Sequence, residues 1–222
     1  MEKIFFVGGG KGGVGKTLAT MALLDYSLSN LENPLLVESD TSNPDVFMSY
    51  KNEVKTETLV LDEADGWIEL VNAGAAHDGP IVINSGARID PTQGIENLEI
   101  ALPELNRALV IVWVINTQRD SLELLRKFRD VVKNAQYIIF KNLHFGSEEK
   151  FSLYNESELK QEIEAERGIS ISFPQVANRV THDIYVQRMS IARGMREMPL
   201  GSRAELSRWR KQVYRIFNEA GL

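Results

Sequence analysis

Apolar residues along the chain cluster in short runs that are rich in β-branched and aromatic side chains. Most of these runs lack the strict alternation of apolar and polar positions that marks a strand with one wet face, which indicates strands covered on both sides. The runs span residues 4–7, 35–37, 58–61, 81–83, 109–115, 137–140 and 169–173. We therefore expect a short buried strand at each of these places.

Stretches with helical spacing separate the expected strands. They cover residues 16–29, 64–75, 120–133 and 156–167, and two more are expected after Pro174, at about 180–195 and 203–219. Strands that alternate with helices pair in parallel through right-handed crossovers. The pattern predicts an α/β fold, a three-layer sandwich around a mostly parallel sheet. At 222 residues the chain is expected to be a single domain, 1–222, whose part from about 177 to 222 is helical.

Two long segments interrupt this alternation. Residues 41–57 and 84–101 carry turn formers such as Pro44, Gly86 and Pro91 and are predicted to be loops. Both follow expected strands, at the ends where parallel sheets bind their ligands. A candidate ligand site is therefore expected at this edge of the sheet.

The composition of the chain limits the kinds of cofactor site, cross-link and membrane segment that it can form. The chain contains no cysteine, which excludes disulfides, iron–sulfur clusters and thiolate zinc sites. No apolar run approaches the roughly 18 residues of a membrane span, and no signal peptide is evident after Lys3. We expect a soluble, cytoplasmic protein.

Charge is distributed unevenly along the chain. The net charge is −6, yet residues 179–222 hold nine Arg or Lys against four Asp or Glu. Such a basic quarter is typical of a surface that meets an anionic partner, either nucleic acid or membrane. A solvated helix face explains the same pattern, and charge alone does not separate the two interpretations.

The stretch GGGKGGVGKT at residues 8–17 links an expected strand to an expected helix. This order is that of a phosphate-binding P-loop, in which glycines let successive backbone N–H groups point at phosphate oxygens. Lys16 is predicted to contact the β- and γ-phosphates, and the Thr17 hydroxyl to ligate Mg²⁺. A flexible turn is the alternative for a glycine cluster without this spacing.

A second lysine, Lys11, is not explained by an ordinary P-loop. The stretch from Lys11 to Thr17 resembles the deviant Walker A motif of the ParA/MinD superfamily of ATPases, in which the early lysine reaches the nucleotide of a partner subunit. The resemblance implies ATP and Mg²⁺ as cofactors and a homodimer with ATP between its subunits. A lysine supplied from the partner acts as an arginine finger does. The loop residues implied in nucleotide binding are Gly10, Lys11, Gly12, Gly13, Val14, Gly15, Lys16, Thr17 and Leu18.

The segment after the second expected strand looks like the first switch of this superfamily. Its pattern is an aspartate, one residue, then a second aspartate; here Glu38 stands at the first position and Asp40 at the second. By this resemblance Asp40 would position the attacking water, and Glu38 would help to hold hydrated Mg²⁺. The alternative for Asp40 is that it only begins a turn.

The expected strand at 81–83 departs from the superfamily pattern where it ends. Asn84 stands in the place of the Walker B aspartate, so the amide can accept a hydrogen bond from metal-bound water but brings no charge. We expect weaker metal binding and slow hydrolysis at this site. Residues 59–63, with Asp62, are an alternative Walker-B-like run closer to the P-loop.

Two later positions resemble the base-binding part of the superfamily. Asn142 ends an expected strand, as the adenine-contacting asparagine does, and Pro174 falls where a backbone segment flanks the adenine. A plain strand-end cap is the alternative for Asn142. Gly86 with Ala87, and Asp40 with Asn43, look most like the small plasmid-borne TraL/StbB branch.

The last expected helix is both amphipathic and basic. Its apolar positions, such as Leu206, Trp209 and Val213, are predicted to close the core, although a helix of this kind can also lie on a membrane. The resemblance implies that Arg and Lys in this quarter, Arg188 and Arg196 among them, bind DNA through phosphates without reading sequence.

The sequence therefore predicts an ATPase switch for plasmid partition, positioning or conjugative transfer. Such a switch dimerises on ATP and Mg²⁺, hydrolyses slowly, and can meet DNA or a partner protein that stimulates hydrolysis. Two alternatives remain open at this point: an ATP-binding adaptor that does not hydrolyse, and an ATP-dependent metabolic ligase resembling dethiobiotin synthetase.

Overall fold

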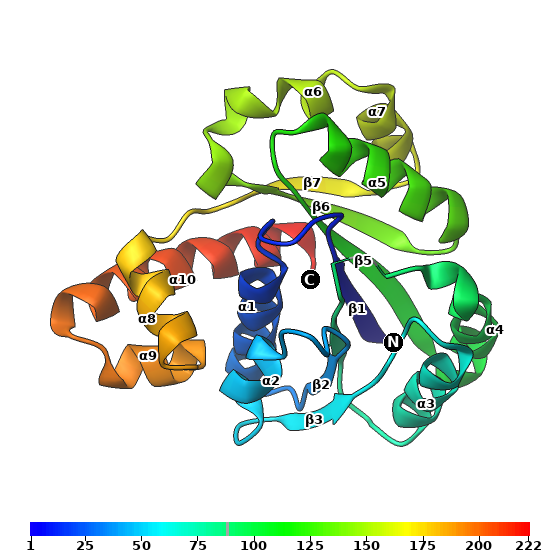
Figure 1. Cartoon of the computed structure of the whole chain (residues 1–222), viewed down its shortest axis with the longest axis horizontal. Helices are drawn as coiled ribbons and strands as arrows, with labels where there is room; N and C mark the ends of the chain where they lie inside the picture. The colour runs from blue at the N-terminus through cyan, green and yellow to red at the C-terminus, as the bar shows by residue number, and fades with distance from the viewer. Residues whose placement is uncertain (88) are drawn as a thin grey trace.

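A seven-stranded parallel sheet organises the chain, and helices cover both of its faces (Figure 1). The computed structural model describes residues 1–87 and 89–222. In space the strands lie in the order β3-β2-β4-β1-β5-β6-β7. Their bounds are Glu2–Gly8 for β1, Leu35–Glu38 for β2, Lys55–Thr58 for β3, Ile81–Asn84 for β4, Arg107–Ile115 for β5, Gln136–Asn142 for β6 and Ile169–Phe173 for β7. The predicted α/β sandwich is confirmed, with every pair of neighbouring strands parallel.

The two faces of the sheet carry different sets of helices (Figure 1). One face packs against α1 (Lys16–Ser29), α2 (Asp45–Tyr50), α8 (Asn178–Val186), α9 (Ile191–Glu197) and α10 (Leu200–Ala220). The other packs against α3 (Ala64–Ala75), α4 (Ile95–Leu105), α5 (Arg119–Val131), α6 (Ser152–Asn155) and α7 (Glu158–Ala165). Short 3₁₀ turns occur at η1 (Pro91–Gln93), η2 (Leu143–Phe145) and η3 (Glu148–Phe151). Burial on both faces explains why the central strands read as continuous apolar runs.

Several sequence-based boundaries were wrong. The strand expected at 58–61 lies earlier, at Lys55–Thr58, because this edge strand is short and only partly covered, and so lacks the apolar run that marks the others. Residues 59–63 form a turn, so the alternative Walker-B-like run is not a strand. The segment 41–57 holds α2 and β3, and 84–101 contains the first part of α4.

The C-terminal quarter is helical, as predicted, but its first helix is broken. In place of one helix at 180–195, α8 ends at Val186 and α9 begins at Ile191. Arg188 lies between them with a left-handed φ of 47°, a conformation that interrupts a right-handed helix. Ser190 then caps α9 by accepting a hydrogen bond from the Arg193 backbone N–H.

The last helix packs into the core, as its apolar spacing predicted. Leu206, Trp209, Val213 and Phe217 are all buried, and the Trp209 indole donates a hydrogen bond to the Pro174 carbonyl at 2.8 Å. On the neighbouring helix α1, the buried carboxylate of Asp25 accepts hydrogen bonds from Arg210 and Tyr214, each at 2.6 Å. Within the described residues, no helix is long and apolar enough to cross a bilayer.

Truncating the anchor of α10 should destabilise the whole sheet. We expect Trp209→Ala to lower the free energy of unfolding by about 3–5 kcal/mol, because it leaves a cavity and removes the hydrogen bond to Pro174. Urea denaturation followed by circular dichroism measures this loss. Leu200→Ala is the matched control, since Leu200 lies on the same helix with 75% of its side chain exposed. Equal stability of the two variants would contradict the packing role of Trp209.

Candidate functional site

The glycine loop lies at the carboxyl end of the sheet, between the end of β1 and the start of α1. Gly13 and Gly15 have φ angles of 77° and 109°, in the left-handed region that glycine adopts without a steric penalty. The loop borders a cavity of about 330 Å³. Its lining residues are Gly12, Gly13, Gly15, Lys16, Thr17, Asp40, Ser42, Asn43, Asp45, Asn84, Ala87 and Tyr185. The first-switch segment and the end of β4 are thus brought to the glycine loop.

Lys16 lies in the floor of this cavity and is almost fully buried. Its ammonium group is 3.4 Å from the backbone carbonyl of Lys11, on the same loop. Burial lowers the pKa of Lys16, and the nearby negative charge of Asp40 acts in the opposite direction. A buried cation at the root of a glycine loop favours an anionic ligand there.

Asp40 lies across the cavity from Lys16, in the turn that follows β2. Its carboxylate accepts hydrogen bonds from the Ser42 hydroxyl at 2.8 Å and from the Asn43 backbone N–H at 3.1 Å. Both contacts are local, so the turn holds the carboxylate at the cavity wall. The turn interpretation and the water-positioning role are therefore compatible, and the second stays a prediction.

Glu38 and Asn84 are directly bonded to each other. They are register partners at the ends of β2 and β4, and the Asn84 amide donates to the Glu38 carboxylate at 2.7 Å. The side-chain amide oxygen of Asn84 accepts a hydrogen bond from the Thr20 hydroxyl on α1 at 3.0 Å. Asn84 reaches the cavity wall, whereas Glu38 is not among the residues that line it. The side-chain amide of Asn84 is thus hydrogen-bonded on both sides.

The Glu38 side chain is fully buried. Its carboxylate also accepts the backbone N–H groups of Asp40 and Phe47, at 3.1 and 3.2 Å, so it fixes the start of α2. Burial raises the pKa of Glu38 to about 7, although the three hydrogen bonds act to lower it. The predicted role of Glu38 and Asn84 in holding hydrated Mg²⁺ stays a prediction. In the structure the two side chains are hydrogen-bonded to each other.

Asn142 connects the far side of the sheet to the glycine loop. From the end of β6 its amide donates to the Val14 carbonyl at 2.8 Å, and its oxygen accepts the His144 backbone N–H at 3.0 Å. A Cβ atom at Gly15 would lie 2.4 Å from the Asn142 amide nitrogen, so this contact requires glycine there. Asn142 therefore caps the strand end and supports the loop; its contact with adenine, like that of Pro174, stays a prediction.

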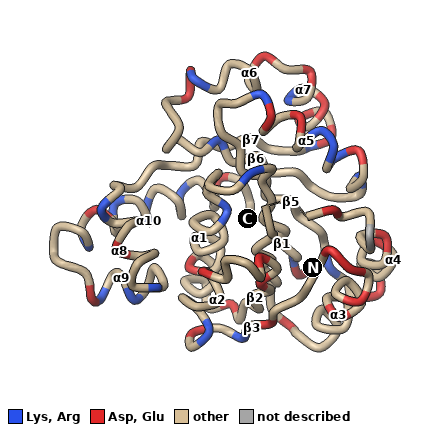
Figure 2. Tube along the Cα trace, in the orientation of Figure 1, with Lys and Arg blue, Asp and Glu red and all other residues tan. Residues whose placement is uncertain are grey.

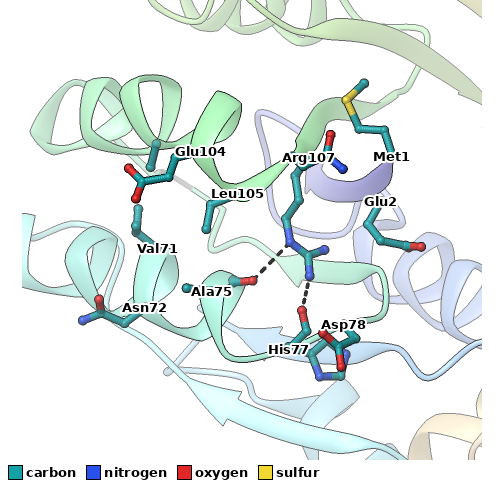
Figure 3. Close-up of a pocket in the computed structure, with 13 residues that line it drawn as sticks. Met1, Glu2, Val71, Asn72, Ala75, His77, Asp78, Glu104, Leu105 and Arg107 are labelled. Carbon is teal, nitrogen blue, oxygen red and sulfur yellow. Dashed lines mark hydrogen bonds between the residues drawn. The ribbon is translucent and has the colours of Figure 1, made fainter.

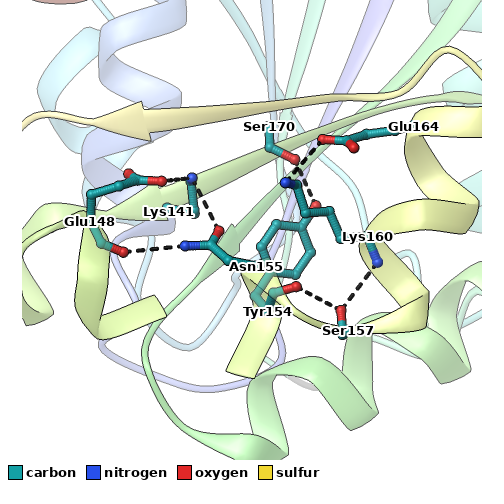
Figure 4. Close-up of polar contacts among 8 residues, drawn as sticks. All are labelled: Lys141, Glu148, Tyr154, Asn155, Ser157, Lys160, Glu164 and Ser170. Atoms are coloured by element: carbon teal, nitrogen blue, oxygen red, sulfur yellow. Dashed lines mark hydrogen bonds and ion pairs between the residues drawn. The ribbon is translucent and has the colours of Figure 1, made fainter. Parts of the chain in front are cut away.

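Lys141, the residue before Asn142 on β6, contacts the segment 143–155 that follows the strand. Lys141 points to the other face of β6, where its ammonium group is paired with Glu148 and lies 3.4 Å from the Asn155 amide oxygen (Figure 4). Asn155 in turn donates to the Glu148 backbone carbonyl at 3.3 Å. This partly buried network ties residues 143–155 to the sheet beside Asn142.

Lys11 lies on the same loop but is not among the residues that line the cavity, and 40% of its side chain is exposed. Its ammonium group is 2.5 Å from the carboxylate of Asp120, in the first turn of α5. The Lys11 ammonium holds the pKa of Asp120 below its usual value. The two lysines of the loop therefore occupy different environments, one buried at the floor and one at the surface.

A larger cavity of about 640 Å³ lies at the opposite end of the sheet, near the starts of β1 and β5 (Figure 3). Its buried Arg107 donates hydrogen bonds to the backbone carbonyls of Gly74, His77 and Gly79. The guanidinium thus satisfies carbonyl groups at and after the end of α3. Glu2, Asp78 and Glu104 add negative charge to the lining, which disfavours a phosphate ligand there.

Sequence reasoning gave no site role to five residues that line the glycine-loop cavity, namely Ser42, Asn43, Asp45, Ala87 and Tyr185. Asp45 begins α2, and Tyr185 comes from α8, in the C-terminal quarter. No local motif marks Tyr185, because tertiary packing alone brings it to the loop. Asp45 follows Pro44 in a segment predicted to be a loop, and its position at a helix start was the available signal.

Comparison with known proteins places the chain in a family. It is 50% identical over 220 residues to the MobD protein of Acidithiobacillus ferrooxidans, which covers 97% of this chain and 96% of that protein. The chain belongs to the MobD family. No protein-family model matches this MobD family member.

Solved structures share the fold of this MobD family member at low sequence identity. A Borrelia burgdorferi B31 protein described as a plasmid partition protein, bound to AMPPNP, has a TM-score of 0.56 at 14% identity, with 99% of each chain covered. The MinD cell division protein of Aquifex aeolicus has a TM-score of 0.51 at 16% identity, with 96% of this chain and 97% of that chain covered. At the level of the fold, the resemblance to the ParA/MinD superfamily is confirmed. The TraL/StbB branch stays a prediction.

The buried carboxylate of Glu38 should make the stability of the MobD family member depend on pH. Its pKa is about 7 in the folded chain against an ordinary 4.5, so the folded state keeps a proton that the unfolded chain releases. Its contribution to stability is therefore full below pH 4.5 and is lost as the pH rises to about 7, by about 3 kcal/mol.

Glu38→Gln removes this titration, so its stability relative to the wild type should rise by that amount between pH 4.5 and pH 7. Urea unfolding at several pH values measures the difference. Glu69→Gln, at an exposed position on α3, is the control and should follow the wild type throughout. A constant difference between Glu38→Gln and the wild type would show that Glu38 does not titrate in this range.

Proposed function

We propose that this protein is an ATP-dependent molecular switch of the ParA/MinD type. ATP with Mg²⁺ binds in the glycine-loop cavity, two copies of the chain close face to face over the nucleotides, and slow hydrolysis reopens them. The whole chain, 1–222, acts as one unit. The observation that carries the proposal is the separation of the loop's two lysines, because buried Lys16 lines the cavity whereas Lys11 lies outside the lining and is partly exposed.

The role of each loop lysine follows from its position. Lys16 is fixed by burial beside the chain's own cavity and serves the chain's own phosphates. Lys11 is held by one exposed carboxylate, and solvent-exposed ion pairs are weak, so little opposes its transfer to a more negative ligand. A phosphate chain presented by a second copy is such a ligand.

The residues around the cavity suit a hydrated magnesium ion in part. Thr17 and Asp40 line the cavity and supply the hydroxyl and carboxylate oxygens that Mg²⁺ prefers. When bound, the ion would neutralise charge on the phosphates. Asn84 reaches the wall as a neutral amide that is already hydrogen-bonded to Glu38, so this side of the cavity offers the cation less charge. Weak metal binding and slow turnover follow from that loss.

The neutral amide of Asn84 at the cavity wall also supports a second candidate function. An ATP-binding adaptor that does not hydrolyse would need the phosphate loop but not a charged Walker B residue. Asp40 separates the two candidates, because the switch needs a carboxylate to orient the attacking water and the adaptor does not.

Partners of the switch would be DNA or a protein that stimulates hydrolysis, acting in plasmid partition, positioning or conjugative transfer. Both blue and red positions occur along the C-terminal helices (Figure 2). Arg193, Arg208 and Arg215 are paired with glutamates of their own helices, and Arg210 is paired with buried Asp25. DNA phosphates would therefore be contacted by the remaining basic residues, namely Arg179, Arg188, Arg196, Arg203 and Lys211.

Removing the Lys11 side chain tests the proposed nucleotide-dependent dimer. Lys11→Ala should bind AMPPNP with nearly unchanged affinity, since Lys16 and the loop remain, yet should stay monomeric where the wild type dimerises. Sedimentation velocity with AMPPNP and Mg²⁺ measures the state of assembly. Lys133→Ala, which removes an exposed lysine elsewhere, should dimerise normally. A Lys11→Ala variant that still dimerises with nucleotide would refute the role in trans.

Phosphate release distinguishes the switch from the adaptor. We expect slow release by the wild type, faster with duplex DNA if DNA is the stimulating partner, and at least about tenfold slower release by Asp40→Ala. Asp62→Ala is the matched control, because Asp62 is an exposed aspartate of the alternative Walker-B-like run and should have no effect. Release that is absent in the wild type under all conditions would favour the adaptor.

A further inference from the structure

An aromatic residue from the C-terminal quarter reaches the glycine-loop cavity. Tyr185 lies in the last turn of α8 and lines the same cavity as Gly13, Lys16 and Thr17. Its side chain is about a third exposed, at 36%, whereas Ile184 before it is fully buried in the core. Helix α8 is therefore anchored by Ile184 and presents Tyr185 to the site.

Tyr185 lies at the phosphate end of the site. The cavity that it lines is bounded by Gly12 of the loop, by Asp40 and Asp45 of the segment after β2, and by Ala87 after β4. Asn142 and Pro174, the predicted neighbours of the base, are not part of this lining. In the proposed nucleotide site the phosphates would occupy the cavity beside the glycine loop, so Tyr185 would lie near the phosphates and not near the base.

The chemistry of the phenol suits a phosphate oxygen. A tyrosine hydroxyl donates one hydrogen bond, and donation to an anion is stronger than donation to a neutral acceptor. Burial, with the negative charge of Asp45 as the lesser cause, raises the pKa of Tyr185 to about 12. The hydroxyl thus keeps its proton at neutral pH and remains a donor.

We propose that Tyr185 donates a hydrogen bond to the terminal phosphate of the bound nucleoside triphosphate and thereby couples α8 to the presence of that phosphate. This inference rests on the proposed function, because it names a further residue of the same nucleotide site. The segment from Pro174 to Ala177 leads into α8 from β7, and α9 follows it. Gain or loss of the terminal phosphate would therefore act directly on α8 and α9, which carry Arg179 and Arg196, and on the turn between them, which carries Arg188.

The test compares two nucleotides and three variants. Affinities for AMPPNP and ADP, each with Mg²⁺, are measured by calorimetry for the wild type, Tyr185→Phe, Tyr185→Ala and Val186→Ala. Val186 is the matched control, because it is the next residue of the same turn, is 67% exposed and does not line the cavity. Repeating the series in the Lys11→Ala background removes any contribution of dimerisation to affinity.

Tyr185→Phe should weaken AMPPNP binding roughly tenfold or more and leave ADP binding nearly unchanged, because only the hydroxyl is lost. In hydrogen exchange, AMPPNP should protect residues 178–189 of the wild type and of Val186→Ala more than ADP does. Tyr185→Phe and Tyr185→Ala should lose this difference.

Three results would decide against the inference. They are equal AMPPNP affinities for Tyr185→Phe and the wild type, an equal loss for AMPPNP and ADP, and protection of α8 that survives in Tyr185→Ala. A wild-type protein that binds neither nucleotide would instead overturn the proposed function, so the two failures are distinguishable.

Discussion

The parallel direction of the sheet is the constraint on which the rest of the structure depends. Because β1, β2, β4 and β6 run the same way, the side chains at their carboxyl ends gather at one edge. Glu38 and Asn84 become register partners, and Asn142 reaches the loop although 128 residues separate it from Val14. Reversing one strand would disperse this set, whereas the glycine loop by itself would survive as a local motif.

The ends of β2 and β4 pair one acid, Glu38, with one amide, Asn84. A pair of aspartates at these positions would place two negative charges side by side, which is costly in a dry environment. Because Asn84 carries an amide, Glu38 is the one carboxylate of this pair. It accepts hydrogen bonds from Asn84 and from the backbone N–H groups of Asp40 and Phe47. The pair thus strengthens the frame of the site while it offers a bound cation less charge.

The sequence predicted the parts of the molecule that depend on short-range signals. The buried strands, the glycine loop between β1 and α1, and α1 itself follow from runs of neighbouring residues, and they lie within a few residues of their predicted bounds. The edge strand β3 and the break at Arg188 were missed, because weak burial and a left-handed residue leave no apolar pattern. Tyr185 and the Lys11–Asp120 pair were also missed, since their partners lie far away in sequence and only the packed fold brings them together.

The position of α10 limits what the basic C-terminal quarter can do. An amphipathic helix lies on a membrane by inserting its apolar face, but the apolar face of α10 is already buried through Leu206, Trp209 and Phe217. Freeing that face would expose the core and break the hydrogen bond from Trp209 to Pro174, at the entrance to α8. The quarter is therefore better suited to form a wall of the glycine-loop cavity through Tyr185 than to act as a detachable membrane anchor.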